Sequence, residues 1–422
     1  MTLAATFLAG AKSRLLPASI PFRFFAAAAA FHILLWGALV AEADQLARFT
    51  GGLGPMLAVV HLLTLGVLTT TAMGASVQLL PVATRRAMVA VWPIKLVFWL
   101  TVPGMAALIA GMYAAQTAVL IAAAAVTAAG LVLFAALLAD NLRRAGSLPV
   151  VAAYGWAALG ALVLLVGLGL ALALDYEIGA LPDHNAAALA HMILGGFGFM
   201  GLLALGFSHV LVPMFALAAA PAKRPAFAGF ALASTALALG SIGALADSRR
   251  LLTIAALIGL AAIALHLWLM QRVLTSGMRK RLGLSFVLIR AAWLVLPVTL
   301  LVGLAALHGW AGPGGPTLFG LLLIGGWLLT FLLGVLQRIL PFLASMHAAG
   351  TTSGAPRLMS ELAASWPIKI HAACHLIALV ALASAIVVDV QWLARLGSMV
   401  GLVGALAFAW FTVSVTRPLT GA

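Results

Sequence analysis

The stretch of sequence that decides the fold is residues 55–81, PMLAVVHLLTLGVLTTTAMGASVQLLP. It contains no Asp, Glu, Lys or Arg, and it is longer than the roughly 20 apolar residues that an α-helix needs to cross the hydrocarbon core of a membrane. The whole chain has this character, since 65% of its 422 residues are hydrophobic and only 8% are charged. A soluble domain of that composition would have too little polar surface to face water. The sequence therefore predicts an integral membrane protein.

Apolar runs of this kind recur along the chain and are separated by short polar breaks, which predicts an all-α bundle of twelve transmembrane helices. No break is long enough to hold a soluble domain, so residues 21–422 are expected to form a single membrane domain. The expected spans are 21–43, 55–80, 89–112, 116–139, 149–174, 186–212, 225–246, 251–274, 285–307, 316–340, 366–388 and 391–415.

Residues 1–20 do not have the pattern of a cleaved signal peptide, because Lys12 and Arg14 follow the first apolar residues instead of preceding them. They are expected to form an amphipathic segment on the cytoplasmic surface. The single cysteine, Cys374, excludes an internal disulfide.

The net charge of +14 follows the topology of the membrane and does not indicate nucleic-acid binding. If the N-terminus is cytoplasmic, fourteen Lys and Arg residues face the cytoplasm. The opposite side then receives only Arg48, Arg249, Arg250 and Arg395, together with most of the acids. Cytoplasmic loops of membrane proteins carry this excess of positive charge. The distribution predicts cytoplasmic termini and a multi-pass protein of a bacterial-type inner membrane, whose main partner is the lipid bilayer.

Three spans share a motif in which Gly precedes Pro by seven residues, with a polar side chain three or four residues after the Gly. The copies are Gly74-Ala-Ser-Val-Gln-Leu-Leu-Pro81, Gly206-Phe-Ser-His-Val-Leu-Val-Pro213 and Gly334-Val-Leu-Gln-Arg-Ile-Leu-Pro341. They end the second, sixth and tenth spans, so the period is four helices. Trp92-Pro-Ile-Lys95 and Trp366-Pro-Ile-Lys369 also recur eight spans apart. The pattern predicts three four-helix repeats, at about 21–145, 149–282 and 285–417, around a pseudo-threefold axis.

Most of the ten histidines lie inside apolar segments, where an imidazole is costly to bury unless something binds it. His61 and His191 lie near the outer ends of the second and sixth spans, in the matching segments His61-Leu-Leu-Thr-Leu-Gly66 and His191-Met-Ile-Leu-Gly-Gly196. His32 approaches the same depth. These three residues are expected to share a metal or haem cofactor.

A second set of potential ligands lies nearer the inner face and contains His371, Cys374, His375 and His209. The first three share one helix face, at i, i+3 and i+4. Imidazole and thiolate suit copper or zinc, although a helix face that lines a polar interior would show the same pattern. His209 is 18 residues from His191, or about 27 Å along a helix, so these two cannot bind one metal ion. Taken alone, His266 and His347 are expected to be interface or loop histidines.

The twelve spans, the four-helix period and the outer histidines resemble the haem-copper oxidase catalytic subunit. The chain is more similar to the NnrS family of haem- and copper-containing membrane proteins, through Phe22-Arg-Phe-Phe25 and the two histidine segments. The resemblance implies haem and copper as cofactors, His61 and His191 as candidate axial ligands with His32 beside them, and a role in electron transfer or nitric oxide handling with a respiratory-chain electron donor.

The sequence also departs from both families. The seventh and tenth spans contain no histidine, so a complete oxygen-reducing centre is not expected. The residues around His61 lack the histidine and glutamate that usually lie nearby in NnrS proteins. Two other functions remain open. One is a secondary transporter or channel that uses intramembrane histidines, and the other is a cofactor-free assembly subunit of a respiratory complex.

Overall fold

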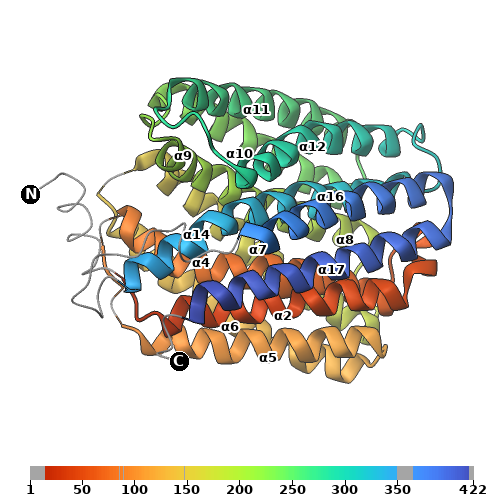
Figure 1. The fold of residues 1–422 in the computed structure, drawn as a ribbon. Helices are drawn as coiled ribbons and strands as arrows, with labels where there is room; N and C mark the ends of the chain where they lie inside the picture. Colours follow the sequence, from red (N-terminus) through yellow and green to blue (C-terminus); the bar gives the residue numbers. More distant parts are fainter. Residues whose placement is uncertain (1–14, 85, 89, 147, 349–364, 418–422) are drawn as a thin grey trace, which may run out of the picture.

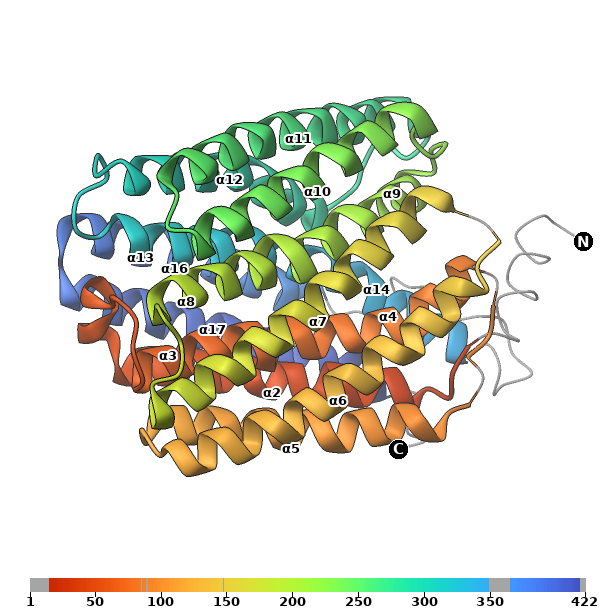
Figure 2. The same ribbon diagram turned by 180° about the vertical axis from the view of Figure 1, so that it is seen from behind.

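The computed structural model describes residues 15–417 except 85, 89, 147 and 349–364. All regular structure in these residues is helical, and twelve helices are long and apolar enough to cross a membrane, which confirms the predicted spans. In chain order they run over Ser19–Ala41, Pro55–Val82, Trp92–Tyr113, Thr117–Arg143, Pro149–Ile178, His184–Ala216, Lys223–Leu245, Arg249–Ser276, Leu284–Leu307, Gly315–His347, Ser365–Val388 and Gln391–Thr416. The helices lie side by side in one bundle (Figures 1 and 2).

Nine of these twelve spans are single helices, and the second, sixth and tenth consist of three segments each. The single helices are α2 (Ser19–Ala41), α5 (Trp92–Tyr113), α6 (Thr117–Arg143), α7 (Pro149–Ile178), α10 (Lys223–Leu245), α11 (Arg249–Ser276), α12 (Leu284–Leu307), α16 (Ser365–Val388) and α17 (Gln391–Thr416). The other three, called the central spans below, are α3 (Pro55–His61), η2 (Leu62–Thr69) and α4 (Thr70–Thr84); α8 (His184–Ile193), η3 (Leu194–Gly201) and α9 (Leu202–Ala216); and α13 (Gly315–Gly320), η4 (Leu321–Leu329) and α14 (Thr330–Ala348).

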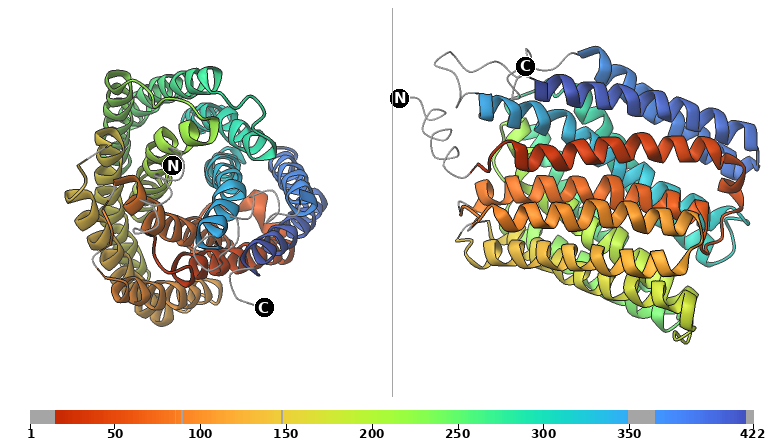
Figure 3. Two further views of the ribbon diagram at one scale, coloured as in Figure 1. Left: turned by 60° about the vertical axis from the view of Figure 1, so that its left-hand side comes forward. Right: turned by 90° about the horizontal axis from the view of Figure 1, so that it is seen from below.

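The central spans lie in the interior and contact one another. A Cβ atom on Gly196 would lie 2.8 Å from the Leu323 side chain, which shows how closely η3 approaches η4. The segments η2 and η4 are also in contact. The end view in Figure 3 shows the light-blue end of α14 inside a ring of other helices. The outer ring includes the tightly packed helical hairpins α5/α6, α10/α11 and α16/α17.

Each central span contains a π-helical stretch, of eight residues in η2 and η3 and nine in η4. A π-helix bonds to the fifth residue back and is wider than an α-helix. Threonine hydroxyls support the widened turns, because Thr70 Oγ1 donates to Leu65 O at 3.0 Å and Thr330 Oγ1 donates to Gly325 O at 2.9 Å. Such stretches occur frequently at functional sites.

Glycine pairs hold each central span against the span that precedes it. The two glycines of each pair are eight residues apart, and a Cβ atom on any of them would lie 2.7 or 2.8 Å from an atom of the preceding span. The contacts are Gly66 with Phe31 and Gly74 with Phe24 of α2, Gly198 with Ala161 and Gly206 with Tyr154 of α7, and Gly326 with Val295 and Gly334 with Ser285 of α12. Larger residues at these positions would force the helices apart.

The prolines of the three motifs lie inside the central spans and do not end them. The helices continue past Pro81 to Thr84, past Pro213 to Ala216 and past Pro341 to Ala348. A proline near a helix end removes a single backbone hydrogen bond, so the last turn survives. Helix α2 begins, and α17 ends, at the same end of the bundle (Figure 1). The predicted N-terminal segment lies largely outside the described residues.

Candidate functional site

The structure sorts seven intramembrane histidines into three groups. The first is the His61–His191 pair, from α3 and α8. The second, called the α16 cluster, contains His371 and His375 of α16 and His32 of α2. The third is the His209–His266 pair, from α9 and α11.

The His61–His191 pair brings together the two residues that the sequence predicts as axial ligands. The ring centroids are 6.4 Å apart and the ring planes are inclined by 30°. His61 Nδ1 lies 2.9 Å from Leu57 O and donates to it in the neutral ring, which leaves Nε2 as the free ligand atom. His191 packs against α7 at Gly169, where a Cβ atom would lie 3.0 Å from His191 Cε1. Its Nδ1 is buried without a hydrogen-bond partner among the described residues.

The separation of these rings fits two imidazoles on opposite sides of one metal ion. Each metal–nitrogen bond is about 2 Å and the ring centre lies about 1 Å further, so such a pair has centroids about 6 Å apart. The observed 6.4 Å agrees with a nearly linear arrangement. The potential ligands are therefore two imidazole nitrogens from separate spans.

His32 lies in the α16 cluster, where its ring contacts Trp36, His371 and Phe408. Trp36 Nε1 donates to His32 Nε2 at 3.0 Å. Because an indole N–H can only donate, His32 carries its proton on Nδ1. Both nitrogens are then unsuited to metal binding, and the Nδ1–H group is buried beside the α16 histidines without a hydrogen-bond partner among the described residues. His32 therefore lies in the α16 cluster and not beside His61 and His191, where the sequence predicts it as a third ligand.

The two α16 histidines stack with centroids 5.9 Å apart, and each has one polar partner on α14. His375 Nε2 lies 2.8 Å from Thr330 Oγ1. Because that hydroxyl already donates its only proton to Gly325 O, it accepts from the imidazole. His371 Nδ1 lies 3.5 Å from Gln337 Nε2. Each histidine of this cluster thus has one partnered ring nitrogen, while His32 Nδ1, His371 Nε2 and His375 Nδ1 are buried without a partner among the described residues.

Replacing Thr330 with valine should destabilise the protein by about 1–3 kcal/mol, because the buried N–H of His375 would lose its acceptor while the packing volume stays nearly the same. Thermal unfolding in detergent measures the effect. The matched control is Thr412→Val, since the Thr412 hydroxyl only donates to Phe408 O within its own helix. Equal stabilities of the two variants would contradict the assigned hydrogen bond.

The four residues predicted as metal ligands do not meet at one point. Cys374 is half-buried and packs against α17, where its Cβ lies 3.0 Å from the place of a Cβ on Gly404. His209 belongs to a different group from His371 and His375. Within the described part of the chain, no group of three or more His, Cys, Asp or Glu side chains could hold a metal ion.

The His209–His266 pair includes a residue whose burial the sequence does not reveal. His266 is only 3% exposed, whereas the sequence predicts an interface or loop position. The centroids of the two rings are 5.6 Å apart and their planes are inclined by 82°, and the Tyr154 ring of α7 also lies 5.6 Å from the His209 ring. His209 Nε2 and both nitrogens of His266 are buried without a partner among the described residues. Each unsatisfied group of this kind costs about 1–3 kcal/mol. An apolar helix gives no sequence signal for which side faces the interior.

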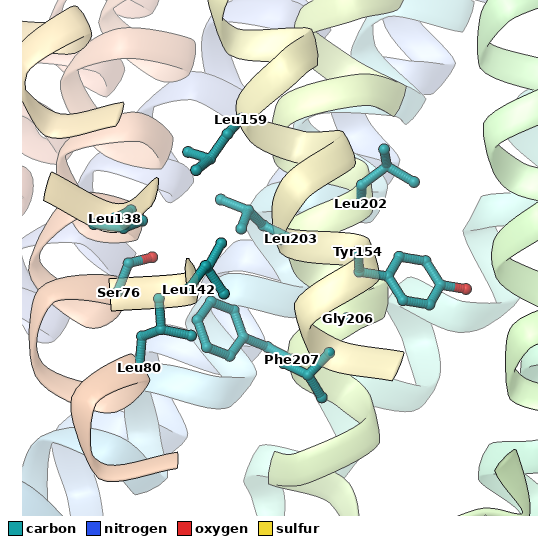
Figure 4. Close-up of a pocket in the computed structure, with 12 residues that line it drawn as sticks. Ser76, Leu80, Leu138, Leu142, Tyr154, Leu159, Leu202, Leu203, Gly206 and Phe207 are labelled. Carbon is teal, nitrogen blue, oxygen red and sulfur yellow. The ribbon is translucent and has the colours of Figure 1, made fainter. Parts of the chain in front are cut away.

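Two small cavities lie at matching places in the bundle. One lies between α4, α6, α7 and α9 (Figure 4). The other lies between α2, η2, α4, α14 and α17. Leu80 and Leu340, each six residues after the glycine of its motif, line the first and the second cavity respectively. The second cavity is the more polar, since His32 and Thr71 line it.

No known protein family matches this chain, and no curated protein is similar to it in sequence. The geometry of the histidine groups is therefore the main guide to function.

Proposed function

We propose that this multi-pass membrane protein binds haem through His61 and His191 and acts in electron transfer or in the handling of nitric oxide. The observation that carries the proposal is the pair of imidazoles from two different spans, with centroids 6.4 Å apart and planes inclined by 30°. That spacing fits two axial ligands on opposite sides of one iron. The resemblance to NnrS proteins points to the same chemistry.

The residues around the pair support its role as a ligand pair. The hydrogen bond from His61 Nδ1 to Leu57 O fixes the ring orientation, and hydrogen bonds of this kind also raise ligand basicity. Gly169 leaves room for His191 against α7. Both histidines lie beside π-helical stretches, with η2 starting immediately after His61 and η3 starting three residues after His191. Rigid ligands on packed helices suit one-electron transfer.

If His61 and His191 both held the haem, the haem would supply one-electron transfer chemistry, and the two histidines would fix its position between the spans. We place the pair toward the outer face, where a respiratory-chain donor would deliver electrons. Copper is not assigned to the α16 residues, because the rings of His371 and His375 are stacked and Cys374 packs against α17.

For the architecture, we propose three four-helix repeats with both termini in the cytoplasm of a bacterial-type cell. The π-helical stretches, the glycine pairs and the matching cavities all recur with the four-helix period. The glycine pairs also set a register in which His61 precedes its motif glycine by 13 residues and His191 by 15. The two ligands are thus offset by two residues within the repeat.

An absorption spectrum tests the proposal directly. The protein purified in detergent, from cells supplied with a haem precursor, should show a Soret band and about one haem per chain by pyridine haemochrome assay. Electron paramagnetic resonance of the oxidised protein should show a low-spin signal of an iron with two imidazole ligands. Colourless protein that also fails to take up added haemin would exclude the proposal.

A further inference from the structure

Among the described residues, His266 has no hydrogen-bond partner in the interior of the bundle. It is 3% exposed and both of its nitrogens are unpartnered, whereas each α16 histidine has one partnered nitrogen, through Thr330 or Gln337. The ring that faces it belongs to His209, which is 6% exposed and has an unpartnered Nε2. Imidazole nitrogens need a hydrogen-bond or metal partner when they are removed from water. An ion bound between the two rings would supply the partner that these nitrogens lack among the described residues.

The spacing of the pair indicates a bent coordination geometry. With metal–nitrogen bonds of about 2 Å, two imidazoles have centroids about 6 Å apart in a linear arrangement and about 5 Å apart at the tetrahedral angle. The observed 5.6 Å lies between these values, and the rings are nearly perpendicular. A single ion with a bent arrangement of the two nitrogens, open enough for a third ligand, fits this separation.

The third position on such an ion has a candidate in Met270. It is fully buried and lies one turn after His266 on the same face of α11. A thioether is a soft ligand that selects copper(I), whereas zinc prefers thiolate, imidazole and carboxylate ligands and takes four of them in structural sites. Within the described residues no group of three or more His, Cys, Asp or Glu provides a zinc site here.

The charge of the ion also matters, because both imidazoles are neutral ligands. The penalty for placing an ion in a medium of low dielectric constant rises with the square of its charge. A monovalent ion is therefore favoured over a divalent one where no carboxylate neutralises it. From the geometry, the buried unpartnered nitrogens and the adjacent thioether, we infer that His209, His266 and Met270 form a copper(I) site.

This site is independent of the proposed haem. His191 and His209 belong to the same span and are 18 residues apart, which is about 27 Å along a helix. Loss of haem therefore does not imply loss of copper, and the two cofactors are measured separately.

The test is an anaerobic titration of the detergent-purified full chain with copper(I) in competition with bicinchoninate. It uses a Cys374→Ser background, so that the only thiol does not bind the probe. We expect one copper per chain. His209→Ala, His266→Ala or Met270→Leu should each lower the affinity for copper(I) roughly 100-fold or more, because loss even of a group that only orients a ligand lowers metal affinity by up to about 100-fold. Met270→Leu conserves volume, so its stability should change little. X-ray absorption should show nitrogen and sulfur neighbours.

The matched control is His375→Ala, which removes an equally buried imidazole from the α16 cluster and should leave copper binding unchanged. Copper binding that survives His266→Ala and disappears in His375→Ala would place the ion at α16 and overturn the inference. Failure to bind copper(I), or tighter binding of zinc than of copper, would also overturn it. A variant that elutes as an aggregate is replaced by His266→Gln, which keeps a polar side chain in the same space.

Discussion

Replacing either His61 or His191 with alanine should remove the haem, so that the Soret absorbance per protein falls close to zero in each single variant. The two rings are 6.4 Å apart, and each would supply one of the two axial bonds to the iron. A haem held on one side only, in a pocket without the second ligand, would be lost during purification. The double variant should show no further loss. The measurement is the haem-to-protein ratio.

Two controls separate loss of the ligand from loss of the fold. His184→Ala changes an imidazole two turns before His191 on α8, which is bonded to Asp175 and should leave the haem in place. Adding free imidazole to His61→Gly should restore part of the Soret band, because the small ligand fills the vacated position. Full haem content in both His61→Ala and His191→Ala would rule out the assigned ligands.

Replacing Gly401 with alanine should destabilise the protein by about 2–4 kcal/mol. Gly401 lies in α17 against the indole of Trp36 in α2, and a Cβ atom at this position would overlap three atoms of that ring. Trp36 is buried and donates to His32, so the ring cannot move without breaking that bond. Thermal unfolding in detergent should reveal a large decrease in the midpoint.

The chain offers a close control in Gly37, which follows Trp36 on α2 and has no neighbouring atom within 4 Å of the place that an added Cβ would take. Gly37→Ala should leave stability unchanged. A Trp36→Ala substitution removes the overlapping ring, so the double variant with Gly401→Ala should be more stable than the sum of the two single effects predicts. Additive effects would show that the close contact of α2 and α17 is not the cause.

Much of the fold could be predicted from the sequence, because the length of an apolar run limits what it can form in a membrane. All twelve spans appear where the hydropathy places them. The motif glycines predict close packing of helices, and the structure gives each of them a close neighbour. The depth of His61 and His191 also follows from the order of the spans, and the rings of these two residues meet.

The arrangement of the remaining histidines could not be predicted in the same way. The expected depth along the helix groups His32 with His61 and His191. In the structure, His32 packs against His371 of α16. The sequence predicts His266 at an interface or in a loop, but it faces His209 inside the bundle. His371 and His375 share a helix face as expected, whereas Cys374 packs against Gly404 of α17.

The sequence by itself therefore determined the membrane class and the number and limits of the spans. Only the tertiary structure decided which residues face one another. The physical reason is that a helix in hydrocarbon is apolar on every side, so its sequence carries little information about its rotation. Rotation is fixed by close packing between helices, through contacts such as Gly401 with Trp36 and Gly169 with His191.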